Sequence, residues 1–385
     1  MKKVGIIGGG AAGIFCAITV KQQLKDKVKV TILERQARIG KKILQTGSGK
    51  CNLTNINIDE TNYNTASLQE ALKSFTPEKC ISLFHDLGIL TRVDDYGRVY
   101  PYSERATTVL EGLMHHLNKF GVEIICDYDV TGIKKDDKFI CFSKDGFHEF
   151  DYLVLATGGQ SSVNFENHGY DLAKRLGHSI NAIRPGLVAM KTKEDTKPLR
   201  GIRVKADCSL TNNDKKIAST SGEVQFRNDG LSGIAILDLS RFYKPNVKIS
   251  LDLVPEMDKE KLKEFIDFND LETSLLGMFP KMIAIDILKR SKNKPDLAID
   301  IIKDYKFEIV GLHDFKNAQV TIGGIDFKEV SLSSYESLKV KDLYIIGEVL
   351  NIDGACGGYN LHFAWMSGYL SAHRIVKQIK ERGLL

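Results

Sequence analysis

The chain has 385 residues, enough for two or three domains and a large core. Its 43% hydrophobic and 27% charged residues are typical of a soluble globular protein, and no apolar run approaches the roughly 20 residues that span a bilayer. The seven cysteines are scattered without a C-x-x-C pair, so no zinc site, other metal site or disulfide framework is predicted. The net charge of +5 permits an acidic partner without requiring one. A strand-like segment follows Lys2 and Lys3 with no signal peptide, so we expect a cytoplasmic protein that does not enter the membrane.

The first motif lies at residues 4–13, Val-Gly-Ile-Ile-Gly-Gly-Gly-Ala-Ala-Gly. The apolar start predicts a short buried strand, and Gly8, Gly10 and Gly13 follow with the G-x-G-x-x-G spacing. In a dinucleotide-binding turn the first glycine allows a tight turn, the second leaves room for a pyrophosphate, and the third lets the next helix lie close. We expect that helix over about residues 11–25, with its N-terminus favouring a phosphate.

A second strand is expected over residues 28–33 and ends at Glu34, 21 residues beyond Gly13. At this position an acidic side chain accepts hydrogen bonds from ribose hydroxyls. The loop 35–55 is polar and interrupted by glycines, which favours contact with a polar ligand over a merely solvated loop. Strand, glycines, helix, strand and acid in this register favour a dinucleotide site over a structural glycine turn.

The next segment predicts helices over residues 67–90 and 107–119, with short strands at 90–93, 98–100, 122–126, 128–133 and 139–142. An apolar strand then runs from residue 151 into Ala156-Thr157-Gly158-Gly159. Such a glycine-ended strand suits a position against a bound dinucleotide; the alternative is an ordinary buried strand with a turn. Two-part FAD folds usually have this second strand, whereas a nicotinamide-only Rossmann domain does not need it.

The composition changes from about residue 186. Residues 190–205 hold six basic residues against two acidic ones, strands are expected near 203–210, 216–227 and 247–253, and residues 257–306 are helix-like with further lysines. Basic residues at this density favour a solvated face; a nucleic-acid surface is the alternative, and no RNA-binding signature motif accompanies them.

The last third returns to an α/β pattern. A strand at 318–325 is expected to re-enter the first domain, and a strand at 342–346 ends at Gly347-Glu348. The loop 349–356 leads to Gly357-Gly358 and a final helix over about 361–381, whose N-terminus can face an anion or an electron-rich ring edge. Cys356 and Tyr359 beside this loop could donate a proton, but packing roles are favoured for both. Packing is likewise favoured for Cys51, and hydrogen-bonded structural roles for His178 and His313.

Together these residues resemble the BaiN-like (YhiN-like) bacterial flavoproteins, NAD(P)/FAD-dependent oxidoreductases also called aminoacetone oxidase family FAD-binding enzymes. The resemblance spans the chain and is carried by residues 8–13, 40–55, 156–159 and 343–361, the second and fourth being specific to the family. It implies a Rossmann-like, glutathione-reductase-like α/β fold with inserted β-barrel-like and small helical domains. The implied boundaries are 1–187 with 320–385 for the FAD-binding domain, 188–254 with 307–319 for the barrel, and 255–306 for the helices.

The resemblance also implies one non-covalently bound FAD, with NAD(P)H as a candidate electron donor. The glycines of the first motif would face the pyrophosphate, Glu34 the adenosine ribose, and Val130 the adenine through its backbone. The residues implied to bind the cofactor are Gly8, Gly10, Ala11, Ala12, Gly13, Glu34, Arg35, Lys42, Cys51, Asn52, Thr54, Val130, Ala156, Thr157, Gly158, Gly347, Glu348, Asp353, Gly357, Gly358, Tyr359, Asn360 and Leu361. No catalytic residue is assigned.

The chain departs from the family pattern at several positions. The loop 160–170 lacks the usual proline and the G-S-T-G-D-G run, and Arg227-Asn228 stand where Thr-His is usual. Ile234 replaces a proline, Asn351 a frequent aspartate and His362 a frequent glutamine. FAD binding is compatible with these changes, whereas the substrate pocket of a relative transfers less directly.

The expected function is an FAD-dependent oxidoreductase that transfers a hydride or electrons to or from a small-molecule substrate. Amine oxidation of the aminoacetone type and reduction of a conjugated double bond are both open. One alternative is an RNA-modifying reductase that forms dihydrouridine in ribosomal RNA, with RNA held by the basic middle region. Another is a non-enzymatic FAD-binding module. Only one nucleotide-binding βαβ unit is predicted, so a nicotinamide donor would have to reach the flavin through an open cleft.

Overall fold

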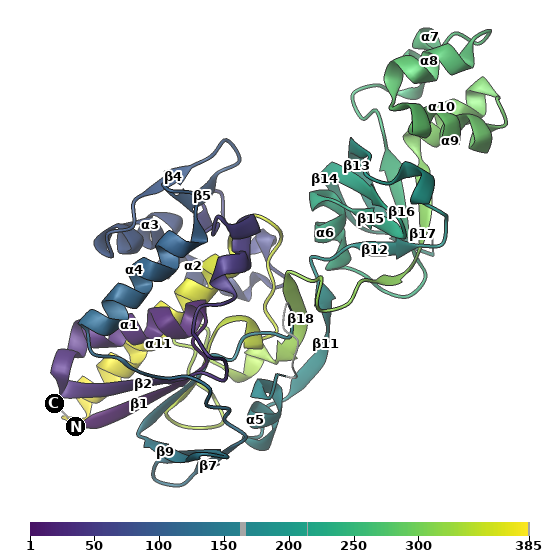
Figure 1. Ribbon diagram of the computed structural model, residues 1–385. Helices are drawn as coiled ribbons and strands as arrows, with labels where there is room; N and C mark the ends of the chain where they lie inside the picture. Colours follow the sequence, from purple (N-terminus) through teal and green to yellow (C-terminus); the bar gives the residue numbers. More distant parts are fainter. Residues whose placement is uncertain (162–166, 214, 384–385) are drawn as a thin grey trace. The chain divides into compact units, whose positions relative to one another are not determined.

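The computed structural model describes residues 1–161, 167–213 and 215–383. The chain forms two compact units, one made of Met1–Arg184 and Val320–Leu385 and the other of Pro185–Gln319 (Figure 1). The departure from the family pattern in the loop 160–170 falls partly on residues 162–166, which lie outside the described residues. The three-domain boundaries taken from the sequence stay a prediction.

The first unit is built on a five-stranded parallel sheet with the strand order β19-β10-β1-β2-β6. The strands are β1 (Lys2–Ile7), β2 (Val28–Leu33), β6 (Glu123–Ile125), β10 (Tyr152–Leu155) and β19 (Leu343–Ile345). Because β1 is the middle strand, with neighbours on both sides, its residues 4–7 are buried and apolar. The predicted Rossmann-like parallel sheet is therefore confirmed.

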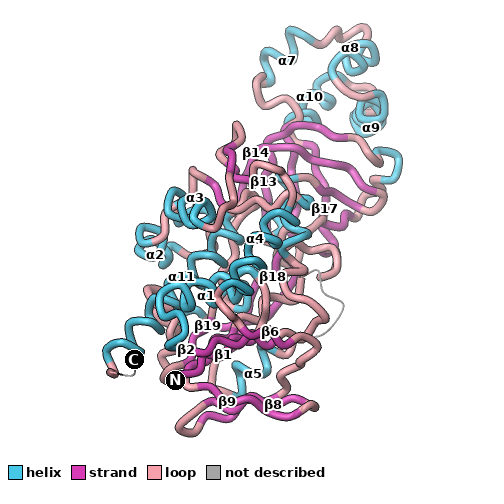
Figure 2. Tube along the Cα trace, turned by 60° about the vertical axis from the view of Figure 1, so that its left-hand side comes forward, coloured by secondary structure: helices cyan, strands magenta, loops and turns pink. Residues whose placement is uncertain are grey.

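Helices cover one face of this sheet, and a small antiparallel sheet with a short helix covers the other (Figures 1 and 2). The covering helices are α1 (Ala11–Leu24), α4 (Ala106–Lys119) and α11 (Tyr359–Glu381). The opposite face carries β7 (Gly132–Lys135), β8 (Phe139–Ser143), β9 (Gly146–Phe150) and α5 (Gly169–Arg175). The antiparallel layer was predicted, but its first strand begins at Gly132 rather than at residue 128.

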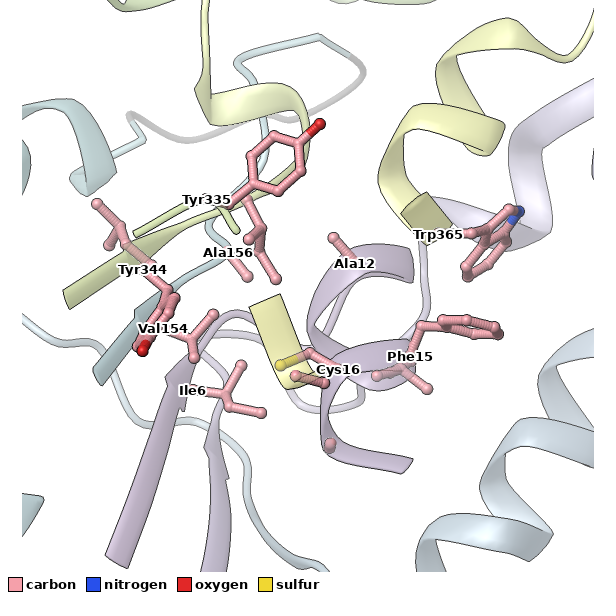
Figure 3. Close-up of a cluster of buried hydrophobic side chains, with 14 of the residues drawn as sticks. Ile6, Ala12, Phe15, Cys16, Val154, Ala156, Tyr335, Tyr344 and Trp365 are labelled. Carbon is pink, nitrogen blue, oxygen red and sulfur yellow. The ribbon is translucent and has the colours of Figure 1, made fainter. Parts of the chain in front are cut away.

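Helix α1 is buried along most of its length because it lies between the sheet and α11. Figure 3 shows Ile6 and Val154 from the sheet to the left of Ala12, Phe15 and Cys16 of α1, with Trp365 of α11 beside Phe15. The ring centroids of Phe15 and Trp365 are 5.5 Å apart. This core fixes the turn between β1 and α1 in place.

The remaining elements of the first unit lie around this frame. They are β3 (Thr54–Asn55), α2 (Gln69–Ser74), α3 (Pro77–Asp86), β4 (Thr91–Val93), β5 (Arg98–Pro101), β11 (Ile180–Gly186) and β18 (Val320–Ile325). The single helix expected over 67–90 is two helices, because Pro77 begins a new one with Thr76 as its N-cap. Strand β18 does belong to the first unit, but it pairs with β11 rather than with the central sheet.

The second unit is a closed barrel with the strand order β12-β15-β14-β13-β16-β17, to which helices are attached. The strands are β12 (Met190–Thr192), β13 (Arg203–Asn212), β14 (Lys215–Arg227), β15 (Gly230–Ser232), β16 (Val247–Asp252) and β17 (Tyr305–Leu312), and α6 (Ile234–Ser240) packs on them. The helices α7 (Lys259–Phe265), α8 (Leu271–Met278), α9 (Lys281–Ser291) and α10 (Pro295–Lys303) gather at one end of the barrel (Figures 1 and 2). Barrel and helices share one hydrophobic cluster.

Candidate cofactor and active site

The three glycines after β1 have different surroundings. A β-carbon at Gly8 would lie 2.3 Å from the carbonyl oxygen of Ala156, and one at Gly13 would lie 2.1 Å from the carbonyl oxygen of Gly8. A β-carbon at Gly10 would meet nothing within 4 Å. The protein's own packing therefore requires Gly8 and Gly13, whereas Gly10 borders open space.

Helix α1 begins at this open space without a side-chain cap. Its N-cap is Gly10, no side chain accepts a hydrogen bond from the first turn, and that turn contains no acidic residue. The N–H groups of Ala11, Ala12 and Gly13 belong to the first turn, whose donors have no partner within a helix. Together with the positive end of the helix dipole, they form a site that favours a phosphate.

Glu34 lies beside this turn at the end of β2. Its Oε2 accepts a hydrogen bond from the Gly9 N–H at 2.8 Å, and its Oε1 accepts one from the Gln36 N–H at 2.9 Å. Burial raises the pKa of Glu34, and these two hydrogen bonds offset only part of that effect. Each carboxylate oxygen keeps a second acceptor site, so Glu34 can also bind ribose hydroxyls.

A pocket runs from this turn along the carboxyl ends of β1, β2 and β10. Thr157, two residues after β10, has a buried Oγ1 that finds no hydrogen-bond partner among the described residues. A β-carbon at Gly158 would meet no atom of the described residues within 4 Å. Of the predicted cofactor residues, the pocket lining includes Gly8, Gly10, Glu34, Arg35, Lys42, Val130, Ala156, Thr157 and Gly158. Arg35 pairs with Asp129 at 3.5 Å, which holds it at the pocket edge.

Lys42 and Glu348 bring the 40–55 loop and the segment after β19 together. The Nζ of Lys42 lies 2.7 Å from Oε2 of Glu348. Glu348 also accepts hydrogen bonds from the Thr321 N–H at 2.8 Å and the Ser161 hydroxyl at 2.9 Å. Burial raises the pKa of Glu348, but Lys42 and these donors outweigh it, so the pKa lies below its ordinary value. Glu348 is therefore a carboxylate at neutral pH.

The second predicted part of the site surrounds the start of α11. Gly358 is the N-cap, with φ of 103°, and no side chain caps the helix. A β-carbon there would lie 2.7 Å from the Thr54 carbonyl oxygen and 2.8 Å from Oδ1 of Asn52. That Oδ1 is buried without a hydrogen-bond partner among the described residues. Asn360 fixes the preceding loop, because its side chain accepts from the Gly354 N–H and donates to the Gly354 carbonyl, both at 2.8 Å.

Several predicted residues turn their side chains into the protein. Cys51 is fully buried, and burial raises the pKa of its thiol to about 12, so it is a neutral packed residue. The Thr54 hydroxyl lies 2.7 Å from Nδ1 of the buried His362. Asp353 is 4% exposed. At Cys51 and Thr54 only the backbone can face a ligand.

Other pocket residues were not named one by one as cofactor residues in the sequence analysis, although Gly9, Gly159 and those of the loop 35–55 lie in segments that it placed at the ligand. They are Gly9, Gln36, Arg38, Gly40, Lys41, Tyr128, Asp129, Gly159, Asn167, His168, Gly169 and Leu172. Asn167 donates to the Gly158 carbonyl at 2.6 Å and accepts from the Gly169 N–H at 2.9 Å. The sequence Asn-His-Gly just before a helix was the available signal, since asparagine and glycine are typical of turns and helix starts.

These features fit a dinucleotide cofactor. The open face of Gly10, the uncapped start of α1 and the oxygens of Thr157 and Asn52 are polar or empty positions that the described part of the chain does not fill. The start of α1, whose first turn has no acidic side chain, suits a pyrophosphate, and Glu34 suits a ribose.

Comparison with known proteins decides the family. The family described as HI0933-like protein Rossmann domain matches residues 2–374. The chain belongs to this family of flavoprotein oxidoreductases. Family membership favours an enzyme over the non-enzymatic module considered above.

Two relatives align with this member of the HI0933-like family over nearly their full length. One is 3-dehydro-bile acid delta(4,6)-reductase of Clostridium scindens, 33% identical over 96% of this chain and 98% of the relative. The other is ribosomal RNA dihydrouridine synthase of Haemophilus influenzae, 30% identical over 97% of this chain and 98% of the relative. A solved 3-ketosteroid delta1-dehydrogenase from Sterolibacterium denitrificans has the same fold, with a TM-score of 0.52 and 10% identity over 98% of this chain and 100% of that one.

No helix in the described part of the chain combines the length and apolar character needed to cross a membrane. Within the same residues, no group of three or more His, Cys, Asp or Glu side chains could hold a metal ion.

Proposed function

We propose that the chain is an FAD-dependent reductase that saturates a carbon–carbon double bond conjugated with a carbonyl group. When bound, FAD supplies the hydride transfer. The observation that carries the cofactor assignment is the open face of Gly10 at the uncapped start of α1, beside the Glu34 carboxylate. Each of these features is explained by a bound dinucleotide.

Different residues of the chain bind different parts of FAD. The first turn of α1 binds the pyrophosphate through backbone N–H groups, and Glu34 binds the adenosine ribose. The Thr157 hydroxyl and the Asn52 side-chain oxygen can form hydrogen bonds with the cofactor, since neither has a partner in the described part of the chain. The Lys42–Glu348 pair joins the 40–55 loop to the segment after β19, so it can orient the linker of the cofactor without adding net charge. The start of α11 lines the flavin side.

The names of the two relatives support the reaction class. A 3-dehydro-bile acid carries a ketone in conjugation with its delta(4,6) double bonds, and dihydrouridine is a uridine whose ring double bond next to a carbonyl has been reduced. Both reactions add a hydride and a proton to an electron-poor double bond. The small-amine oxidase is the less supported alternative, because neither name describes it.

The test is anaerobic half-reaction spectroscopy. The flavin of the purified protein is reduced with NADH, NADPH or dithionite, and a conjugated cyclic enone is then added. The visible absorbance of oxidised flavin should return, with the matching saturated ketone as the negative control. If only oxygen reoxidises the flavin, and small amines reduce it, the protein would be an amine oxidase and not an enone reductase.

A second candidate has the same chemistry with a ribosomal RNA uridine as the substrate. The relative from Haemophilus influenzae supports it. All six basic side chains of residues 190–205 are exposed, but the whole second unit carries 23 basic against 21 acidic residues, so its net charge adds little support. Loss of dihydrouridine from ribosomal RNA in a deletion strain, restored by the wild-type gene, would establish this substrate. An unchanged RNA would exclude it.

A further inference from the structure

The outer face of the three-stranded sheet β3-β5-β4 carries an unusual row of side chains. Val99 and Pro101 of β5 are buried, so the alternate residues Arg98 and Tyr100 point to the opposite, outer face. Arg92 of β4 pairs directly with Tyr100, and Asn55 of β3 pairs with Arg98, which places both on that outer face. The hairpin formed by β4 and β5 is visible in Figure 1.

Tyrosine rings and guanidinium groups alternate along this face. The guanidinium carbon of Arg98 lies 4.9 Å from the ring centre of Tyr96 and 6.0 Å from that of Tyr100, and that of Arg92 lies 5.2 Å from the ring centre of Tyr102. Tyr96 is 74% exposed and Tyr102 60% exposed. We call these five residues the Tyr–Arg ladder. Large exposed aromatic groups gathered on one face are typical of a binding surface.

Carboxylates hold the two arginines of the ladder in place. Asp94 accepts a hydrogen bond from Nε of Arg98 at 2.8 Å, and Glu104 lies 2.8 Å from a terminal nitrogen of Arg92. Glu104 also pairs with Lys50 at 2.6 Å. The guanidinium planes are therefore fixed before any ligand binds, and most of their charge is already balanced. What the two guanidinium groups still offer a ligand is a flat, polarisable face.

The Tyr–Arg ladder is anchored to both segments of the candidate flavin site. The side-chain amide of Asn55 donates to the Tyr96 carbonyl at 3.3 Å and to the Gly357 carbonyl at 3.2 Å. A β-carbon at Gly47 would lie 3.5 Å from the Tyr100 ring, so Tyr100 lies beside the 40–55 loop. A ligand on the ladder would thus lie next to the loops that border the start of α11.

We propose that the Tyr–Arg ladder is a docking surface for unpaired nucleotides of an RNA substrate. Unpaired bases stack on aromatic rings and on guanidinium planes, and an open sheet with exposed aromatics is a recurrent platform for them. A free steroid fits this face poorly, because small apolar ligands need an enclosed site that covers most of their surface. The inference rests on the RNA form of the proposed function and assigns a location to it.

The test is equilibrium binding of a fluorescently labelled single-stranded RNA to the full-length, oxidised protein, measured by anisotropy. Tyr96→Ala and Tyr102→Ala should each weaken binding by about five-fold or more, since base–aromatic stacking is worth about 1–3 kcal/mol. Tyr102→Phe keeps the ring and should bind like the wild type. Phe147→Ala is the matched control, because Phe147 is also 60% exposed but lies on β9. Thermal unfolding verifies that each variant folds.

Stacking also predicts how binding responds to salt and to strand pairing. Because the arginines are already ion-paired, few phosphates are neutralised, and affinity should fall only weakly with salt. The same sequence as a duplex should bind less tightly. The proposal is overturned if the wild type binds no single-stranded RNA. It is also overturned if the alanine variants bind RNA as the wild type does, whether or not they lose enone reduction. Binding needs no reductant, so a failure of the proposed enone reduction leaves this measurement readable.

Discussion

Gly368 of α11 lies so close to α1 that a β-carbon at Gly368 would be 2.5 Å from the carbonyl oxygen of Ala12. Ala12 also lies close to the segment that follows β19, the edge strand of the sheet, since a β-carbon at Gly347 would lie 3.0 Å from the Ala12 methyl group. The first helix and the last helix therefore meet at the candidate cofactor site through backbone contact. Any widening at this crossing moves the two halves of the site apart.

We expect Gly368→Ala to destabilise the protein by about 1–3 kcal/mol, the usual cost of overpacking a tight contact. The helix propensity of alanine offsets at most about 1 kcal/mol of this. FAD affinity should fall with the stability, and chemical denaturation with FAD titration measures both.

The matched control is Gly277→Ala in α8, where a β-carbon would meet nothing within 4 Å. This change should stabilise the protein by about 0.5–1 kcal/mol, because alanine loses less backbone entropy in a helix. Equal effects at the two glycines would show that the helix crossing is not tightly packed.

Gly10→Ala should separate folding from cofactor binding. Gly10 has φ of −86° and ψ of −173°, which alanine adopts readily, and its β-carbon would enter open space. We expect the FAD-free protein to keep its stability within about 0.5 kcal/mol, as surface changes usually do. FAD affinity should fall by about ten-fold or more, because a loss of about 1.4 kcal/mol already gives that factor.

Gly13→Ala is the contrasting variant. Its β-carbon would lie 2.1 Å from the Gly8 carbonyl oxygen, so the FAD-free protein itself should be destabilised. If Gly10→Ala bound FAD like the wild type, the open space at Gly10 would not be the pyrophosphate site.

The glycine motif and Glu34 could be predicted because their relationship is local. One strand, one turn and one helix fix Gly8, Gly10 and Gly13, and the next strand delivers Glu34 to the same edge of the sheet. The parallel sheet could be predicted from the same pattern, whereas the barrel was predicted only from the family resemblance.

The network around Glu348 could not be predicted in this way. Ser161, Thr321 and Lys42 are far from Glu348 in sequence and become its neighbours only through the tertiary fold. Sequence also cannot tell whether a residue offers its side chain or its backbone. Cys51, predicted to bind the cofactor, turns its thiol into the core.

Lys42→Met should destabilise the folded protein and change how its stability depends on pH in the acid range. Glu348 would lose the cation that most lowers its pKa, so the pKa should rise. A lowered carboxylate pKa gives stability that is present above the unfolded value of 4.5 and lost as the pH falls through the folded pKa. Without Lys42, that contribution should shrink, and the loss should be complete at a higher pH.

The expected cost is about 1–2 kcal/mol at pH 7, below that of a fully buried pair because both side chains are partly exposed. Lys73→Met is the control. Lys73 pairs with Glu70 at 2.7 Å on the surface, where such pairs are worth about 0–1 kcal/mol. Urea denaturation at several pH values compares the variants, and equal losses would place Lys42 among ordinary surface lysines.

His362→Gln should remove a pH dependence of stability. His362 is fully buried, with Nδ1 2.7 Å from the Thr54 hydroxyl and Nε2 3.0 Å from the Phe75 carbonyl oxygen. Burial lowers its pKa from 6.5 to about 4, because a charged ring there would lose its hydration. Below pH 6.5 the unfolded chain therefore binds a proton that the folded protein does not bind, and stability falls until about pH 4.

The slope of about 1.36 kcal/mol per pH unit gives a loss of about 2 kcal/mol between pH 6.5 and pH 5. Glutamine has both a donor and an acceptor for Phe75 and Thr54 but does not titrate. The difference in unfolding free energy between pH 7 and pH 5 should therefore be smaller in His362→Gln by about that amount, because other titrating groups act equally in both proteins. The same pH response in both would mean that His362 is protonated in the folded protein, and its hydrogen bond to the Phe75 carbonyl would then be that of a cation.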